Sequence, residues 1–147
     1  MRKFLAVLLS VAMVLGVAGC GSSNSSTKAD DTKDAATTEA ASDIKVGFIF
    51  VGDENEGYTY AHVLGAKEMQ EALGLSDDQI IYKWNIPENE QCYDAAVDLA
   101  EQGCNIIFSN SFGHEDYIIQ AAQEYPDVQF CHATGTQAKA SGLANMH

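Results

Sequence analysis

From residue 44 onward, short apolar runs alternate with amphipathic segments. Runs rich in β-branched and aromatic residues predict strands near 45–51, 79–84, 105–109 and 128–133. Segments whose apolar residues recur every three or four positions predict helices near 58–73, 90–102 and 114–125. In the first helix, the shared apolar face is predicted to hold Ala61, Leu64, Gly65, Met69 and Ala72. Gly74 is predicted to end this helix.

This alternation predicts an α/β fold. Strands with few polar residues, separated by helices, indicate a parallel sheet with helices on both faces. Right-handed crossovers then make the sheet doubly wound. In such sheets ligands bind beyond the carboxyl ends of the strands, so the loops that matter are 52–57, 85–89, 110–113 and 134–139.

The N-terminus has the order of a secretory signal. Arg2 and Lys3 precede an apolar run over 4–17, which is too short for a comfortable membrane span. Small residues then lead to Cys20, a pattern typical of a bacterial lipobox. We therefore expect residues 1–19 to be a signal peptide and Cys20 to carry the lipid; the alternative is an ordinary signal followed by a chance cysteine.

Residues 21–42 have no aromatic and no large aliphatic side chain. A segment of Gly, Ser, Asn, Thr, Asp, Glu, Lys and Ala buries too little apolar surface to offset its ordering entropy. We expect 20–43 to be the lipidated cysteine and a disordered linker, and 44–147 to be the folded part. This composition is typical of a Gram-positive lipoprotein stalk, which indicates lipid anchoring on the extracytoplasmic face of the cell membrane.

The charge of the chain argues against nucleic-acid binding. Eight basic residues stand against 21 acidic ones, for a formal net charge of −13, and two of the basic residues lie in the predicted signal. Such a surface repels phosphate backbones.

The common motifs for nucleotide phosphates and metals are absent from the sequence. The loop at 52–57 has neither the Gly-x-Gly-x-x-Gly pattern nor a Walker lysine, and the histidines lack metal-ligand spacing. We expect no cofactor and no metal.

No catalytic pattern is present. The segment 109–111 is not a Gly-x-Ser-x-Gly elbow, and no base accompanies a nucleophilic cysteine. Cys92, Cys104 and Cys131 are expected to be buried free thiols, with a Cys104–Cys131 bridge as the alternative. The sequence predicts a binding protein, not an enzyme.

Four segments carry a specific resemblance: Val51-Gly52-Asp53, Gly57-Tyr58-Thr59-Tyr60-Ala61-His62, Ser109-Asn110-Ser111-Phe112-Gly113, and Phe130-Cys131-His132-Ala133-Thr134-Gly135. With the lipobox, they resemble the basic membrane protein family of ABC transporter substrate-binding lipoproteins, which includes purine nucleoside receptors. The resemblance implies a type I periplasmic-binding fold with two lobes closing over a ligand. Residues 44–147 would be most of the first lobe, truncated before the second.

The resemblance also implies ligand-binding residues in the first loop. Asp53 matches the family's ligand-binding aspartate; its alternative role is capping the turn or first helix. Tyr58 and Tyr60 offer flat faces for stacking on a purine, and Thr59 matches a small hydroxyl residue of the family. The alternative for these side chains is packing between helix and sheet.

The later loops supply further candidates. Ser111 and Phe112 begin the third helix, where free backbone N–H groups favour polar ligand atoms; Phe112 would complete an aromatic sandwich, while Ser111 could instead cap the helix. Thr134 follows the fourth strand. The second acidic residue of the nucleoside receptors has no secure counterpart, which leaves nucleoside and free base both open.

The resulting hypothesis is a receptor that captures a purine nucleoside or nucleobase and delivers it to an ABC permease and its ATPase. Signalling or sugar binding by the same fold is the alternative. A sugar site usually adds arginine contacts, and the chain has no arginine after Arg2.

Overall fold

The computed structural model describes residues 43–147. The predicted signal peptide, Cys20 and nearly all of the predicted linker lie outside this range, so those predictions stay predictions. No helix between residues 43 and 147 is long and apolar enough to cross a membrane.

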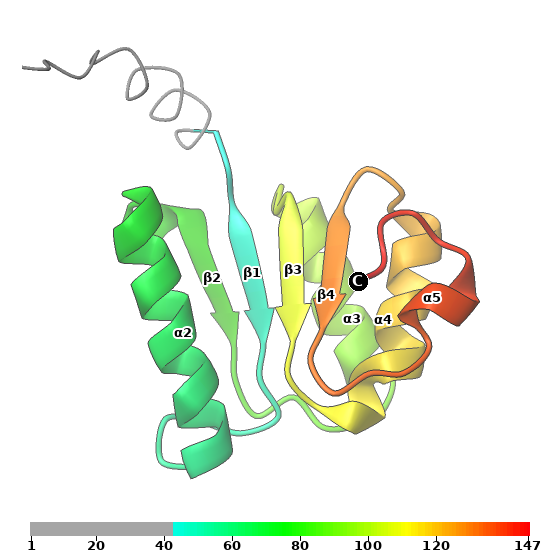
Figure 1. Ribbon diagram of the computed structural model, residues 1–147, viewed down its shortest axis with the longest axis horizontal. Helices are drawn as coiled ribbons and strands as arrows, with labels where there is room; N and C mark the ends of the chain where they lie inside the picture. Colours follow the sequence, from blue (N-terminus) through cyan, green and yellow to red (C-terminus); the bar gives the residue numbers. More distant parts are fainter. Residues whose placement is uncertain (1–42) are drawn as a thin grey trace, which may run out of the picture. The chain divides into compact units, whose positions relative to one another are not determined.

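The described residues form one four-stranded parallel sheet. Its strands are β1 (Val46–Ile49), β2 (Ile80–Lys83), β3 (Ile106–Ser109) and β4 (Gln129–His132), in the spatial order β2-β1-β3-β4 (Figure 1). Phe48 of the central strand stands opposite Tyr82 on one side and Phe108 on the other. All four predicted strands are confirmed, each somewhat shorter than its apolar run.

The helices lie on both faces of the sheet. α2 (Gly57–Leu73) covers one face, whereas α3 (Gln91–Glu101) and α4 (Glu115–Glu124) cover the other (Figure 1). A short helix, α5 (Ala138–Ser141), follows β4. The sheet order reverses between β1 and β3, so the doubly wound α/β fold predicted from the sequence is confirmed.

β1, β2 and β3 contribute to two apolar clusters because successive side chains point to opposite faces. Ile49, Ile107 and Phe130 are fully buried against α3 and α4. Their neighbours Phe48 and Phe50 pack on the α2 side. Burial on both faces explains why the strands are nearly continuous apolar runs.

The face of α2 that packs on the sheet matches the predicted one only in part: Met69 is partly buried against the core cluster on this side. Thr59, Val63 and Ala66 are its buried residues, whereas Leu64 of the predicted face is 43% exposed. Part of the predicted face borders an apolar groove of about 620 Å³ between α2 and the sheet instead. Apolar spacing alone did not show that the β-branched Val63, one position away, occupies the core.

Two caps define the ends of α2. At its start the Glu56 carboxylate accepts hydrogen bonds from the backbone N–H groups of Tyr58 (2.8 Å) and Thr59 (2.7 Å). These bonds hold the pKa of Glu56 below its ordinary value. At its end Gly74 adopts a left-handed conformation with φ of 65°, which confirms the predicted stop.

Some features of the described residues were not predicted from the sequence. Single 3₁₀ turns, Asp77–Gln79 and Phe112–His114, precede β2 and α4. The last residues run alongside β4: the N–H of Phe130 donates to the carbonyl of Asn145, and the N–H of His147 donates to the carbonyl of Phe130. They extend the parallel pairing beyond β4.

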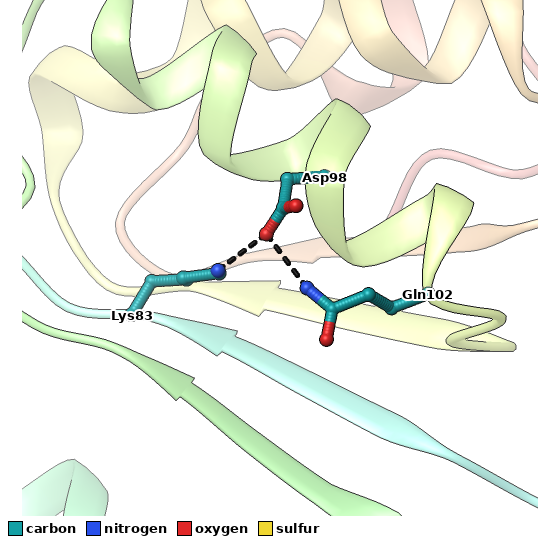
Figure 2. Close-up of polar contacts among 3 residues, drawn as sticks. All are labelled: Lys83, Asp98 and Gln102. Atoms are coloured by element: carbon teal, nitrogen blue, oxygen red, sulfur yellow. Dashed lines mark hydrogen bonds and ion pairs between the residues drawn. The ribbon is translucent and has the colours of Figure 1, made fainter.

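A polar contact joins α3 to the β2 edge of the sheet. Figure 2 shows Lys83 at the end of β2 reaching Asp98 on α3, which also accepts a 2.7 Å hydrogen bond from Gln102. The Lys83 ammonium lowers the pKa of Asp98. Both partners are partly exposed, so this pair orients α3 more than it stabilises the fold.

Candidate functional site

Because the strands are parallel, the loops after them all emerge at one edge of the sheet, at the lower side of Figure 1. The loop after β1 leads into α2, the loop after β2 into α3, the loop after β3 into α4 and the loop after β4 into α5. This edge is where doubly wound sheets bind ligands. Every ligand-binding candidate from the sequence lies on these four loops or on the first turn of α2.

Asn110 connects the loops after β1 and β3. Its side chain is fully buried; Oδ1 accepts a 2.9 Å hydrogen bond from the N–H of Val51, and Nδ2 lies 3.4 Å from the Thr59 hydroxyl. The hydroxyl of Tyr58 donates to the carbonyl oxygen of Asn110. One buried amide and one tyrosine thus fix two of the four loops against each other.

Asp53 organises its own loop. Its carboxylate accepts hydrogen bonds from the backbone N–H of Asn55 (2.9 Å) and from the Asn55 side chain (3.1 Å). This is the turn role that the sequence raised as the alternative to ligand contact. Asp53 nevertheless stays half-buried and lines a shallow polar pocket with Glu54, Asn55, Trp84 and Asn85.

The structure separates the three candidates on the first turn of α2. Tyr58 and Tyr60 are 41% and 45% exposed, so each ring presents a free surface at the loop edge. Thr59 lies between them in sequence but is fully buried, with its N–H on Glu56. In the described lobe Thr59 therefore supports the loop from beneath.

The loop after β3 carries two candidates, of which one is exposed and the other is hydrogen-bonded to a neighbouring loop. Phe112 is 63% exposed, more than any other large apolar side chain of the described residues. Ser111 is largely buried, and its hydroxyl donates to the Glu88 carboxylate. The hydrogen bond that Ser111 can donate is thereby directed at the neighbouring loop.

Thr134 is exposed and has a φ of 70°, in the left-handed region that non-glycine residues rarely adopt. The buried carboxylate of Glu115 holds the residues after it, accepting from the N–H groups of Thr136 and Gln137 (2.6 Å to Gln137). Burial alone raises the pKa of Glu115, but these backbone hydrogen bonds outweigh it and the pKa lies below its usual value.

Two histidines hold the loops by hydrogen bonds to backbone carbonyl groups. His114 is fully buried; its Nε2–H donates to the carbonyl of Ile86 (3.0 Å), and its Nδ1 accepts from the Ser109 hydroxyl (2.9 Å). Burial lowers the pKa of His114, so the ring is neutral. The Nε2–H of His132 donates to the carbonyl of Ser111 (2.6 Å).

Glu88, Asn110, His114 and Trp84 were not among the predicted site residues, although all four lie in or beside the loops singled out from the sequence. A polar residue directly after a buried strand is the signal that could have identified Asn110. Nothing in the local pattern distinguishes Glu88 from the acidic Glu90 two positions later, because its partners lie 23 and 25 residues away.

The three cysteines of the described residues, Cys92, Cys104 and Cys131, are unbridged; the first two are buried as predicted, whereas Cys131 is half-buried. Cys104 packs in the cluster beneath α3 and α4, whereas Cys131 borders the groove on the α2 side, so the sheet separates the pair considered for a bridge. Burial raises the pKa of Cys92 to about 12, which keeps this thiol protonated and unreactive. Residues 43–147 contain no cluster of three or more potential metal ligands.

A doubly wound lobe with polar and aromatic loops gathered at one sheet edge is the architecture of a type I periplasmic-binding fold. The family described as ABC transporter substrate-binding protein PnrA-like (Bmp) matches residues 43–147, and the chain belongs to this family. The resemblance stated from the sequence is confirmed. Family members are substrate-binding proteins of ABC transporters.

Two curated relatives share part of the chain. A purine-binding protein of Brucella abortus (strain 2308) is 38% identical over 93 residues, which are 63% of this chain and 26% of that protein. A putative ABC transporter glucose-binding protein of Haloferax volcanii is 21% identical over 121 residues, which are 81% of this chain and 30% of that protein. The chain thus spans less than a third of the length of each relative.

Solved structures show the same fold. A solute-binding protein of an ABC transporter system from Conexibacter woesei superposes with a TM-score of 0.51 at 24% identity, over 60% of this chain and 28% of that one. A transcriptional activator of the comK gene from Bacillus halodurans gives a TM-score of 0.53 at 21% identity, over 62% of this chain and 30% of that one. At these identities the likeness concerns the fold alone.

Proposed function

We propose that this chain forms the first lobe of an extracytoplasmic receptor that captures a purine nucleoside or nucleobase for an ABC importer. The receptor is held at the membrane by a lipid on Cys20, with residues 21–42 as a tether. Its partners are the permease and ATPase subunits of the transporter. The 38% identity to a protein named for purine binding supports the ligand class.

The observation that carries the proposal is that exposed aromatic rings lie on loops that are held in place by hydrogen bonds at one edge of the sheet. Tyr58 is hydrogen-bonded to the backbone of Asn110, two residues before Phe112, so both rings belong to adjoining loops of one edge. Flat aromatic faces at a carboxyl edge suit a planar base. The carboxylate of Asp53 and its polar pocket add hydrogen-bond acceptors for ribose hydroxyls or an exocyclic amine.

Calorimetric titration of the lipid-free, two-lobed protein with adenosine, guanosine, inosine, adenine, ribose and glucose tests the ligand class. Binding of a purine compound with both sugars silent is the expected result and chooses between nucleoside and base. Glucose is included because one relative is named for it. Glucose or ribose binding with the purines silent would replace the proposal with a sugar receptor.

Two substitutions of Asp53 separate ligand contact from turn formation. Asp53→Asn keeps an oxygen that can accept from the Asn55 N–H but removes the charge, whereas Asp53→Ala removes both. If Asp53 contacts the purine, both variants weaken binding by about tenfold or more, because a charged acceptor is lost. Wild-type affinity in Asp53→Asn with weakened binding in Asp53→Ala would assign Asp53 to the turn alone.

A further inference from the structure

Glu88 reaches from the loop after β2 to the loop after β3. Its Oε1 atom accepts a hydrogen bond from the Ser111 hydroxyl and a second, of 3.0 Å, from the backbone N–H of Gly113. The two donors flank Phe112 in sequence. One carboxylate oxygen therefore holds the side chain before the most exposed aromatic ring of the described lobe and the backbone after it.

The fit between Glu88 and Gly113 leaves no room for a side chain at position 113. A Cβ atom there would lie 2.5 Å from the Glu88 Cδ and 2.7 Å from its Oε1. Atoms cannot approach so closely, so glycine is what allows the carboxylate to lie flat against the loop. The acidic side chain and the glycine are matched across two loops.

Other contacts hold the same loop from below. The buried His114 ring joins the carbonyl of Ile86, in the Glu88 loop, to Ser109 at the end of β3. The N–H of His114 and the Nε2–H of His132 both donate to the carbonyl of Ser111. The backbone around Phe112 is thus held at several points, while the Phe112 ring remains 63% exposed.

Such an arrangement lowers the cost of binding. A ligand that stacks on a mobile ring must order the loop that carries it, and that conformational entropy is subtracted from the affinity. We propose that Glu88 is a positioning residue of the ligand site, whose carboxylate clamps the Ser111–Gly113 segment so that Phe112 is presented in its binding position. This inference rests on the proposed function.

The clamp itself is tested without any ligand, by amide hydrogen exchange at Phe112 and Gly113. Glu88→Ala removes both accepted bonds and is expected to speed exchange of the Gly113 N–H by about tenfold or more, since that amide loses its acceptor. Glu88→Gln retains an oxygen in the same place and is expected to stay close to wild type. Unchanged exchange in Glu88→Ala would overturn the clamp.

The functional consequence is tested by titrating the same variants with the purine that wild type binds. We expect Glu88→Ala to weaken binding by about tenfold, and Glu88→Gln to restore most of the affinity. Glu90→Ala is the matched control, because it removes an exposed acid from the same loop, and it should bind as wild type does. If Glu90→Ala and Glu88→Ala lose the same affinity for the ligand, the loss comes from removing a negative charge and not from the hydrogen bonds of Glu88. That result would overturn the inference.

A double-mutant cycle with Phe112→Ala identifies the route of the effect. If Glu88 acts by presenting the Phe112 ring, Glu88→Ala has little further effect once that ring is gone. Additive losses would show that Glu88 acts elsewhere and overturn the assignment. If wild type binds none of the purines, the proposed function fails, and the exchange measurement alone then decides whether the clamp exists.

Discussion

Buried polar side chains at the ends of the strands determine how the loops are arranged. Asn110 and His114 are fully buried, yet their polar atoms have partners in neighbouring loops. A buried polar group without a partner is costly, so each of these side chains selects the one loop arrangement that satisfies it. The positions of the exposed Tyr58 and Phe112 rings depend on these buried polar side chains.

His114 gives the protein a pH-dependent stability. Its ring is neutral in the fold, with a pKa lowered by burial and by His132, and raised in part by the carbonyl of Ile86 and by Glu88. The unfolded histidine has a pKa of about 6.5 and so binds more protons than the folded one just below that pH. Stability therefore rises with pH in this window, and acidification through it weakens the fold.

The measurement is urea unfolding of wild type and His114→Gln between about pH 5 and pH 7, above the range in which the carboxylates titrate. We expect the wild-type unfolding free energy to fall as the pH is lowered from about 7 to about 5, and this dependence to be weaker in the variant. His62→Gln alters a more exposed ring and serves as the control. Parallel slopes in wild type and His114→Gln would assign the pH dependence to other groups.

At the scale of elements, α2 shows most clearly how local chemistry sets a boundary. Glu56 supplies acceptors for the free N–H groups at the start, and Gly74 supplies the left-handed turn at the end. Gly65, in the helix interior, has ordinary helical geometry and open space around it. The two glycines therefore have opposite effects on the same helix.

Alanine substitutions at these glycines should move stability in opposite directions. A Cβ at either position meets no atom within 4 Å, so sterics are matched and only backbone preference differs. We expect Gly65→Ala to stabilise the protein by up to about 1 kcal/mol, because alanine favours the helix. Gly74→Ala should destabilise it by about 1 kcal/mol or more, because alanine resists φ of 65°.

Chemical unfolding of the two variants and of wild type measures whether the two changes in unfolding free energy have opposite signs. Equal shifts in the same direction would contradict this account of the two backbone positions. The magnitudes lie within the range that denaturant midpoints resolve, provided the slopes of the transitions stay equal.

At the scale of the whole described lobe, the sequence was sufficient for the fold and only partly sufficient for the site. The order of strands and helices follows from local periodicity, which each short segment carries by itself. Gly74 and the polar loops were recognised because their residue types have strong local preferences. The ligand-binding candidates, which the family resemblance implied, all lie at the carboxyl edge of the sheet.

The parts that could not be predicted depend on contacts between distant segments. Glu88 gains its role from Ser111 and Gly113, and the core face of α2 is decided by which side meets Phe48 and Phe50. The pairing of Asn145 and His147 with β4 also lies outside any local pattern. Such choices depend on packing in three dimensions, which periodicity along the chain does not record.

Asn145 shows what one such distant contact contributes. It is 6% exposed, and its Nδ2 lies 3.0, 3.1 and 2.9 Å from the carbonyl oxygens of Ala122, Tyr125 and Val128. These carbonyls end α4 and begin the approach to β4, where helix carbonyls lack partners of their own. The side chain thus joins the segment beside β4 to the end of the preceding helix.

Asn145→Ala removes a donor from the carbonyls of Ala122 and Val128, whereas the carbonyl of Tyr125 keeps the N–H of Val128. We therefore expect a loss of about 2 kcal/mol in the free energy of unfolding. Asn145→Asp should cost more, because a carboxylate would face three carbonyl oxygens with no hydrogen to donate at neutral pH. Gln123→Ala, an exposed change on α4, serves as the control and should stay within about 0.5 kcal/mol of wild type. If Asn145→Ala unfolds at the same urea concentration as this control, solvent replaces the lost donor and the segment beside β4 contributes little to closing the lobe.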